Sequence, residues 1–344
     1  MNTTSVDTTP APAQRTARDI SAFGKFTWLL RREFWENRGG FVWAPVITGI
    51  IMVVLYALLM AVASFLDHGQ INRGIVIAGD PDQKIHAIAG SVGDVMLLTG
   101  IGLAGAVLAF VVFFYALCCL YDDRRDRSVL FWKSLPLSDT QTVLSKLTWA
   151  LLLAPLLALV VGILIGLAMW LITALTMTVN GLPASGAIFT YSHPLRVVGQ
   201  VVSALPIYIA WAMPTVGWLM FCSAWARSKP FLWAALVPIL ACIIVSIMYI
   251  PLGSSIGLSL KTVWYVVVAR GLFSVIPGLW YAALGRQYLH GDLNGQTMPG
   301  ELINAIHLSG GWHAFATADL WIGVVIGAAF IAAAIWLRRH RDDN

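Results

Sequence analysis

Six long apolar stretches of this chain contain no Asp, Glu, Lys, Arg or His. Each is long enough to cross a bilayer core of about 30 Å as an α-helix. The chain is only 11% charged, against about 25% in ordinary soluble domains. These features predict an all-α integral membrane protein with six transmembrane helices. The predicted spans are residues 41–65, 95–120, 147–177, 197–224, 231–252 and 320–337.

The basic residues are distributed unevenly over the predicted loops. If the N-terminus is cytoplasmic and the spans alternate, the inner segments hold sixteen Lys and Arg residues and the outer segments hold six. This bias follows the positive-inside rule and predicts that both termini are cytoplasmic. The net charge of +5 therefore reflects topology and indicates no nucleic-acid partner. Five tryptophans near inner span ends suit the headgroup layer: Trp43, Trp149, Trp225, Trp233 and Trp336.

The two ends of the chain are predicted to lie outside the transmembrane domain of residues 41–337. Residues 1–19 are rich in Thr, Ala and Pro and predict a disordered tail, and residues 338–344 predict a short cytoplasmic tail. Within residues 20–40, apolar residues recur on one helical face, which indicates an amphipathic helix in the inner interface. We expect Gly39 and Gly40 to end that helix. A basic anchor that only fixes topology is the alternative.

Local signals mark helix starts and close helix contacts. Ser138 and Gln141 have the spacing of a capping box, and the helix that starts there is too long to cross the membrane without tilting or projecting. The glycine pairs Gly162/Gly166 and Gly323/Gly327 permit close helix packing. The fourth span contains two prolines, whose freed carbonyls need partners or face a cavity. Four residues of this span are candidates to line such a cavity, with ordinary helix packing as the alternative: Ser203, Tyr208, Trp211 and Thr215.

Residues 253–317 form the predicted outer region before the last span. Residues 262–284 are apolar enough for a seventh span, but Arg270 lies in their middle. A seventh span would also move the basic C-terminal tail outside, against the charge bias. We therefore expect surface or re-entrant helices here, with a break at Pro277-Gly278.

The predicted inner loop at residues 121–146 combines many charged residues with an aromatic pair that is expected to reach into water. It reads YDDRRDRSVLFWKSLPLSDTQTVLSK, which predicts a helix leaving the membrane, a short helix, a turn and a returning helix. The aromatic pair Phe131-Trp132 would be costly if simply exposed. A groove on a soluble partner explains the pair, and a solvated connector is the alternative.

This segment resembles the first cytoplasmic loop of the membrane subunits of type-2 ABC exporters. The likeness runs from Asp123 through the Ser134-Leu135-Pro136-Leu137-Ser138 run to Lys146, and it departs at Asp123, where Glu is usual, and at Arg127, where Gly is typical. The resemblance implies that residues 121–135 form a coupling helix seated on a separate ATPase. The implied coupling residues are Asp123, Arg124, Arg125, Asp126, Arg127, Ser128, Phe131, Trp132 and Lys133. The RREFWENR element resembles the family's connector helix, with Arg31, Arg32, Glu33 and Trp35 as its marked residues.

The resemblance also implies the complex in which the chain acts. It implies a permease in a bacterial inner membrane, paired with a second permease copy and two ATPase subunits that bind ATP and Mg. The sequence contains no G-x-x-x-x-G-K-[ST] motif, so the chain does not cradle nucleotide phosphates by that route. We expect no catalytic residue, metal or cofactor in the chain itself. The charge-free spans suggest an amphipathic, lipid-like or peptide cargo.

Two other functions stay open from the sequence. A lipid-modifying enzyme at the outer face would use Asp292, Glu301 or loop histidines as acid and base. A metal or haem site built from His290, His307 and His313 is a related possibility. A proton-coupled carrier is disfavoured, because such proteins usually keep charges within their spans.

Overall fold

The computed structural model describes residues 21–67, 81–126, 138–180, 186–252, 259–280 and 308–341, and all regular secondary structure in these ranges is helical. Six helices are long and apolar enough to cross a membrane, in agreement with the predicted all-α, six-span architecture. Their ranges are Phe23–Leu66, Gly90–Arg125, Asp139–Val179, Ile188–Trp225, Leu232–Tyr249 and Ala318–His340.

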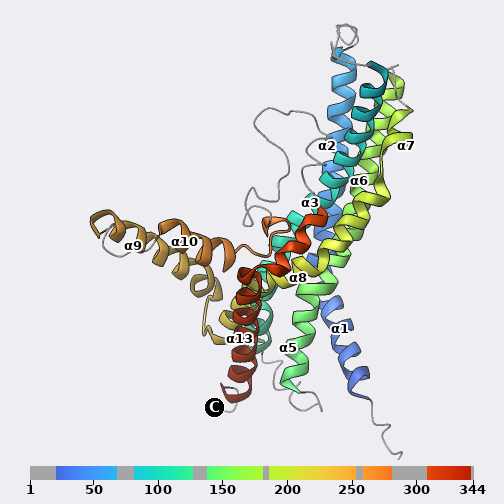
Figure 1. Cartoon of the computed structure of the whole chain (residues 1–344). Coiled ribbons are helices and arrows are strands. Elements are labelled where there is room, and N and C mark those ends of the chain that lie inside the picture. The colour runs from blue at the N-terminus through green and yellow to red at the C-terminus, as the bar shows by residue number, and fades with distance from the viewer. Residues whose placement is uncertain are drawn as a thin grey trace, which may run out of the picture.

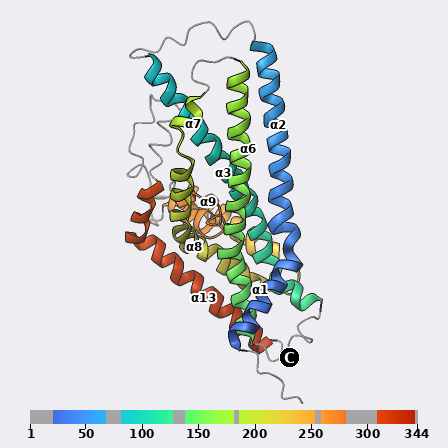
Figure 2. The ribbon, with the colours of Figure 1, turned by 90° about the vertical axis from the view of Figure 1, so that its right-hand side faces the viewer.

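Most of these helices form one elongated bundle (Figures 1 and 2). Its centre is α3 (Pro81–Arg125), which packs against α6 (Ala154–Val179) and α8 (Pro194–Trp225), with α2 (Ala44–Asp67) against α6. The short α7 (Ala187–Tyr191) packs on α3, while α13 (Ala318–Arg341) and η6 (Leu308–Ala316) pack on α8. The helix α1 (Ala22–Arg38), the start of α5 (Asp139–Thr148) and the last turns of α13 lie at one end of the bundle, which we call the α1 end (Figure 1).

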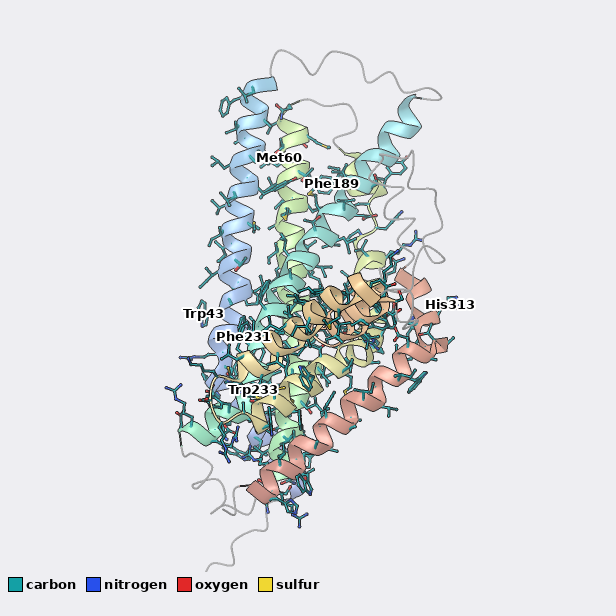
Figure 3. All side chains as sticks on the ribbon, turned by 90° about the vertical axis from the view of Figure 1, so that its left-hand side faces the viewer. Trp43, Met60, Phe189, Phe231, Trp233 and His313 are labelled. Atoms are coloured by element: carbon teal, nitrogen blue, oxygen red, sulfur yellow. The ribbon has the colours of Figure 1, made fainter. Side chains whose placement is uncertain are left out.

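The fifth apolar helix lies apart from the bundle. α9 (Val237–Leu252) and α10 (Leu260–Trp264) run side by side and project sideways, transverse to α2 and α6 (Figure 1). The indole Nε1 of Trp264 donates to Ser246 Oγ at 2.9 Å and joins the two helices. Figure 3 looks along this arm, with Phe231 and Trp233 labelled. The predicted span 231–252 is thus helical and long enough, but its direction differs from that of the others.

Three π-helical turns lie inside long helices, and each ends two residues before a proline. Proline has no N–H, and its ring clashes with the carbonyl four residues earlier in an α-helix. Here the residue just before each proline donates to a carbonyl five residues back, which widens the turn without ending the helix. The turns are η1 (Gly39–Trp43), η2 (Trp149–Leu153) and η3 (Leu232–Leu236), followed by Pro45, Pro155 and Pro238.

This pattern corrects the expectation that Gly39 and Gly40 end the N-terminal helix. Gly39 has right-handed helical angles, φ −59° and ψ −49°. The chain stays helical from α1 through η1 into α2, because Pro45 is accommodated by the π turn rather than by a break. Glycine permits a helix stop but does not enforce one.

Two local predictions from the sequence are confirmed. The Ser138 Oγ accepts from the Gln141 backbone N–H, and the Gln141 side chain accepts from the Ser138 N–H, so the capping box at the start of α5 is complete. Three of the four paired glycines, Gly162, Gly166 and Gly327, also lie at helix contacts, while Gly323 lies against the Arg270 side chain. A Cβ on Gly166 would stand 2.6 Å from the Leu97 carbonyl oxygen of α3, and one on Gly327 would stand 2.6 Å from the Met213 carbonyl oxygen of α8.

Four of the five tryptophans assigned to the headgroup layer are exposed, namely Trp43, Trp225, Trp233 and Trp336. Figure 3 shows Trp43 on the outside of its helix, far from Met60 and Phe189 toward the other end of the bundle. Trp149 is instead buried, and its Nε1 donates to the Leu30 carbonyl of α1 at 2.6 Å. Its place in the core is set by the docking of α1.

The close α3–α6 contact generates a stability prediction. Gly166→Ala should lower the thermal unfolding temperature in detergent, because the new Cβ forces Leu97 and the α3 backbone away. Gly199→Ala on α8 is the matched control, since a Cβ there meets nothing within 4 Å; it should be neutral or stabilise the helix by about 0.5–1 kcal/mol. Equal unfolding temperatures for the two variants would contradict the contact.

Candidate functional site

A chain of buried ion pairs joins four helices at the α1 end. Lys146 Nζ of α5 lies 2.8 Å from Glu33 Oε1 of α1 and 3.4 Å from Asp123 Oδ1 of α3. Arg338 of α13 continues the chain, with Nη1 3.1 Å from Asp123 Oδ2 and Nε 3.2 Å from Asp139 Oδ1. We call these five residues the ion network.

Four of the five members of the ion network are withdrawn from solvent, and Asp139 at its end is 30% exposed. The side chains of Glu33, Lys146, Asp123 and Arg338 are 1%, 3%, 8% and 6% exposed. Removing charges from water is expensive, and only close pairing with further hydrogen bonds repays that expense. Each internal member therefore contacts two opposite charges or an additional donor. Removing Lys146 leaves Glu33 buried without a cation.

Glu33 also fixes α1 to the bundle through neutral partners. The Tyr115 hydroxyl of α3 donates to Glu33 Oε2 at 2.8 Å. The next residue of α1, Phe34, stacks on Trp149 with ring centroids 5.7 Å apart. The predicted apolar stripe of α1 thus packs partly on protein, since Leu30 and Phe34 contact the core while Phe23 is exposed.

The other marked residues of α1 face outward. Arg32 pairs with Glu36 at 2.6 Å along the same helix, and Glu36 is about half exposed. Arg31 and Trp35 are exposed. Only Glu33 of the four residues singled out from RREFWENR reaches the buried interior.

The predicted coupling residues divide into four groups. Asp123 belongs to the ion network. Arg124 Nη2 donates to the carbonyls of Ser223 at 2.6 Å and Ala226 at 3.0 Å, where a cation suits the C-terminus of α8. Arg125 and Asp126 are exposed. The remaining five, Arg127, Ser128, Phe131, Trp132 and Lys133, lie outside the described residues.

Asp123 and Asp139 lie at the helix ends on either side of segment 127–137. Asp123 is in the last turn of α3, and Asp139 is the first residue of α5. Asp123 and Asp139 both contact Arg338. The two aspartates that flank segment 127–137 are thus paired with one guanidinium, that of Arg338 on α13.

A second buried cation lies in the apolar stretch 262–284. Arg270 Nη1 donates to the Trp211 carbonyl at 2.7 Å, and its guanidinium lies 3.7 Å from the Trp211 ring centroid. Its Nη2 donates to the Asp319 carbonyl at 3.2 Å, and a Cβ on Gly323 would collide with it. The pKa of Tyr265 is raised, mainly by burial and to a smaller extent by the hydrogen bond to Asp319. Its hydroxyl therefore stays a neutral donor.

Residues 259–280, which contain Arg270, form short helices and turns. α10 passes into the π turn η4 (Tyr265–Arg270), and turns and bends follow from Gly271 to Gly278. The helix therefore ends at Arg270, before the predicted break at Pro277-Gly278. Gly278 does have a positive φ of +83°, which favours glycine.

The four candidate cavity residues of α8 have different surroundings. Tyr208 lines a cavity of about 190 Å³ between α3, α6, α8 and the turn at 277–280. The Trp211 ring stacks against the Arg270 guanidinium. The Thr215 hydroxyl donates to the Arg270 carbonyl and accepts from the Ser274 N–H. The Ser203 hydroxyl donates to the Gln200 carbonyl of its own helix.

Sequence reasoning singled out Glu33 and Asp123 but missed the pairing that joins them. It left Lys146, Arg338 and Asp139 without a role. The available signal was position: Asp123, Lys146 and Arg338 stand at the edges of three charge-free stretches that end on the same side. Charges at such edges can meet one another across a bundle.

The outer residues offered as catalytic or metal-binding candidates remain largely untested. Asp292, Glu301, His290 and His307 lie outside the described residues, and His313 is exposed on η6. Across the described ranges, no group of three or more His, Cys, Asp or Glu residues is placed to hold a metal ion. No protein-family model, curated protein or solved structure matches the chain significantly.

The ion network predicts an asymmetric pattern of mutational effects. Lys146→Met should destabilise the protein by about 3–5 kcal/mol, because Glu33 is left buried without its cation. The double variant Glu33→Gln/Lys146→Met should lose less than the sum of the two single variants, as expected for contacting residues. Unfolding of the purified protein in detergent measures both.

Glu36→Gln is the control, because it removes a carboxylate one turn away in an exposed pair. Its effect should stay below about 1 kcal/mol. Additive losses in the double variant, or equal losses for Lys146→Met and Glu36→Gln, would contradict the buried pairing.

Proposed function

We propose that this chain is the membrane-spanning permease subunit of an ATP-binding-cassette exporter. It would work with a second permease copy and two separate ATPase subunits that bind ATP and Mg. The cargo would be amphipathic, lipid-like or peptidic. The chain would reside in a bacterial inner membrane with both termini, and hence the α1 end, in the cytoplasm. The chain has no catalytic step of its own in this proposal.

The ion network is the observation that supports the proposal best. Asp123 and Asp139 flank segment 127–137, the stretch that carries the resemblance, and both contact Arg338. Lys146 of α5 also connects α1 to this network through its ion pair with Glu33. A displacement of segment 127–137 by a docked partner would therefore act on α1, α3, α5 and α13 together.

Rigid connection at the point of docking is what coupling requires. A partner shifts a membrane protein between two conformations only as far as it binds them differently. An interface with two discrete arrangements transmits such a preference, whereas a loosely tethered loop would absorb it. Buried ion pairs suit this role, because sliding one charge past its partner without a replacement is strongly unfavourable.

Purification of the native complex tests the proposal. The tagged chain should copurify in mild detergent with a P-loop ATPase, and the purified complex should hydrolyse ATP. Mass spectrometry identifies the partner, and phosphate release measures the hydrolysis. A chain that purifies without any nucleotide-binding protein, even after chemical cross-linking in native membranes, would overturn the assignment.

The docking residues have their own test. Phe131→Ala/Trp132→Ala should reduce the ATPase recovered with the chain by about tenfold, which corresponds to about 1.4 kcal/mol. Phe65→Ala/Leu66→Ala is the matched control, because both residues are exposed at the far end of α2. The two variants should insert and unfold alike. Full ATPase recovery with the Phe131/Trp132 variant would remove the coupling segment from the proposal.

A further inference from the structure

The cavity beside Tyr208 lies within a single copy of the chain. Its volume is about 190 Å³, and its walls come from α3, α6, α8 and the turn at 277–280. Tyr208 and Trp280 are the lining residues with polar side-chain atoms, and the Tyr208 hydroxyl is engaged by the Val275 carbonyl at 3.2 Å. The remaining lining residues are Leu98, Ile101, Gly102, Gly105, Leu108, Pro155, Ala158, Leu159, Val201, Ala204, Leu205, Pro277 and Gly278.

The turn that closes the cavity is held in place. The Ser274 N–H donates to Thr215 Oγ1 at 3.2 Å, and Arg270 anchors the preceding residues on Trp211. Pro277 packs closely on α3, since a Cβ on Gly105 would stand 3.1 Å from its Cγ. The wall of the cavity is therefore fixed by contacts within the chain, as expected for a binding site that is largely pre-formed.

The cavity opens on the outer surface of the bundle, which the six-span architecture would place against lipid. Gly102 and Pro277 are exposed, while Ala158 and Ala204 at the back are buried. Gly102 lies within α3's charge-free stretch 95–120, seven residues after its start. A ligand that enters beside Gly102 would come from the hydrocarbon core of the bilayer rather than from water.

The volume limits what fits. An apolar cavity of about 150 Å³ stays dry and accepts benzene, whereas sites that enclose a drug-sized ligand occupy about 300–1,000 Å³. A cavity of about 190 Å³ takes a short hydrocarbon segment and leaves the rest of the ligand outside. The uncharged walls would leave a charged headgroup unpaired, so the headgroup stays beyond the mouth.

We propose that this cavity binds the end of one alkyl chain of a membrane amphiphile, which enters between Gly102 and Pro277. Burial of methylene groups against Leu98, Ile101 and Leu205 supplies the affinity. Binding of the chain end is independent of any ATPase. Its use as the site for the tail of the cargo rests on the proposed function.

Photolabelling tests this site directly. Palmitic acid carrying a diazirine near its methyl end is added to the purified chain in phosphatidylcholine vesicles, and labelled residues are mapped by mass spectrometry. Labels should concentrate on residues 98–108, 201–208 and 277–280. A second arm places the diazirine on an acyl chain of phosphatidylcholine: labelling by this arm identifies a bilayer lipid as a source, and labelling by the free acid alone identifies a single-chain amphiphile.

Gly102→Leu is the informative variant, because a Cβ at Gly102 meets nothing within 4 Å and the side chain can fill the mouth. It should reduce labelling at the cavity about tenfold, as expected when roughly two methylene groups lose their burial. Gly199→Leu, where a Cβ also meets nothing within 4 Å, should leave the labelling unchanged.

Labelling spread evenly over lipid-facing helices such as α2, and unaffected by Gly102→Leu, would overturn the proposal. If Gly102→Leu does not fold, competition on the unmodified chain decides. Excess unlabelled palmitic acid should remove the cavity labels and spare those on α2, and loss of both in parallel would also overturn it. If no ATPase copurifies with the chain from native membranes but the cavity is labelled, the exporter proposal fails and the alkyl-chain site stands.

Discussion

Lys146 lies between two carboxylates in a nearly water-free environment, and the arrangement of the α1 end depends on that position. Its ammonium contacts Glu33 and Asp123 at once. Glu33 links Lys146 to α1, and Asp123 links it to α3. Asp123 also pairs with Arg338, which adds α13 to the network. A charge that cannot be hydrated must keep its partners, so these helix ends are held in register by electrostatic necessity rather than by apolar packing alone.

Away from the α1 end, a second buried cation plays a similar part. Arg270 joins a turn-rich segment to α8 and α13 through Trp211 and Asp319. The segment it holds continues into the turn that closes the apolar cavity. The two cations thus have different structural roles. Lys146 joins helix ends beside the predicted docking segment, and Arg270 holds the segment that leads into the wall of a candidate ligand site.

Proline and glycine make long helices compatible with these contacts. The π turns before Pro45, Pro155 and Pro238 keep the helices continuous, so a push at one end is carried along a rigid element. Gly166 and Gly327 let backbones touch at the α3–α6 and α8–α13 contacts. Where dispersion and close approach replace hydrophobic driving force, small residues at contacts are the expected solution.

The sequence by itself determined the helical class, the six apolar helices, the capping box at Ser138 and the glycine contacts, because hydropathy, capping and side-chain size act over a few neighbouring residues. It could not place α9 across the bundle, nor turn Glu33 inward toward Lys146. Those outcomes depend on residues far apart in the chain: Glu33 and Lys146 are separated by α2 and α3, and only the packing of helices decides which charges meet. The tertiary structure therefore chose the partners, since pairing of buried charges is a long-range condition that no local pattern records.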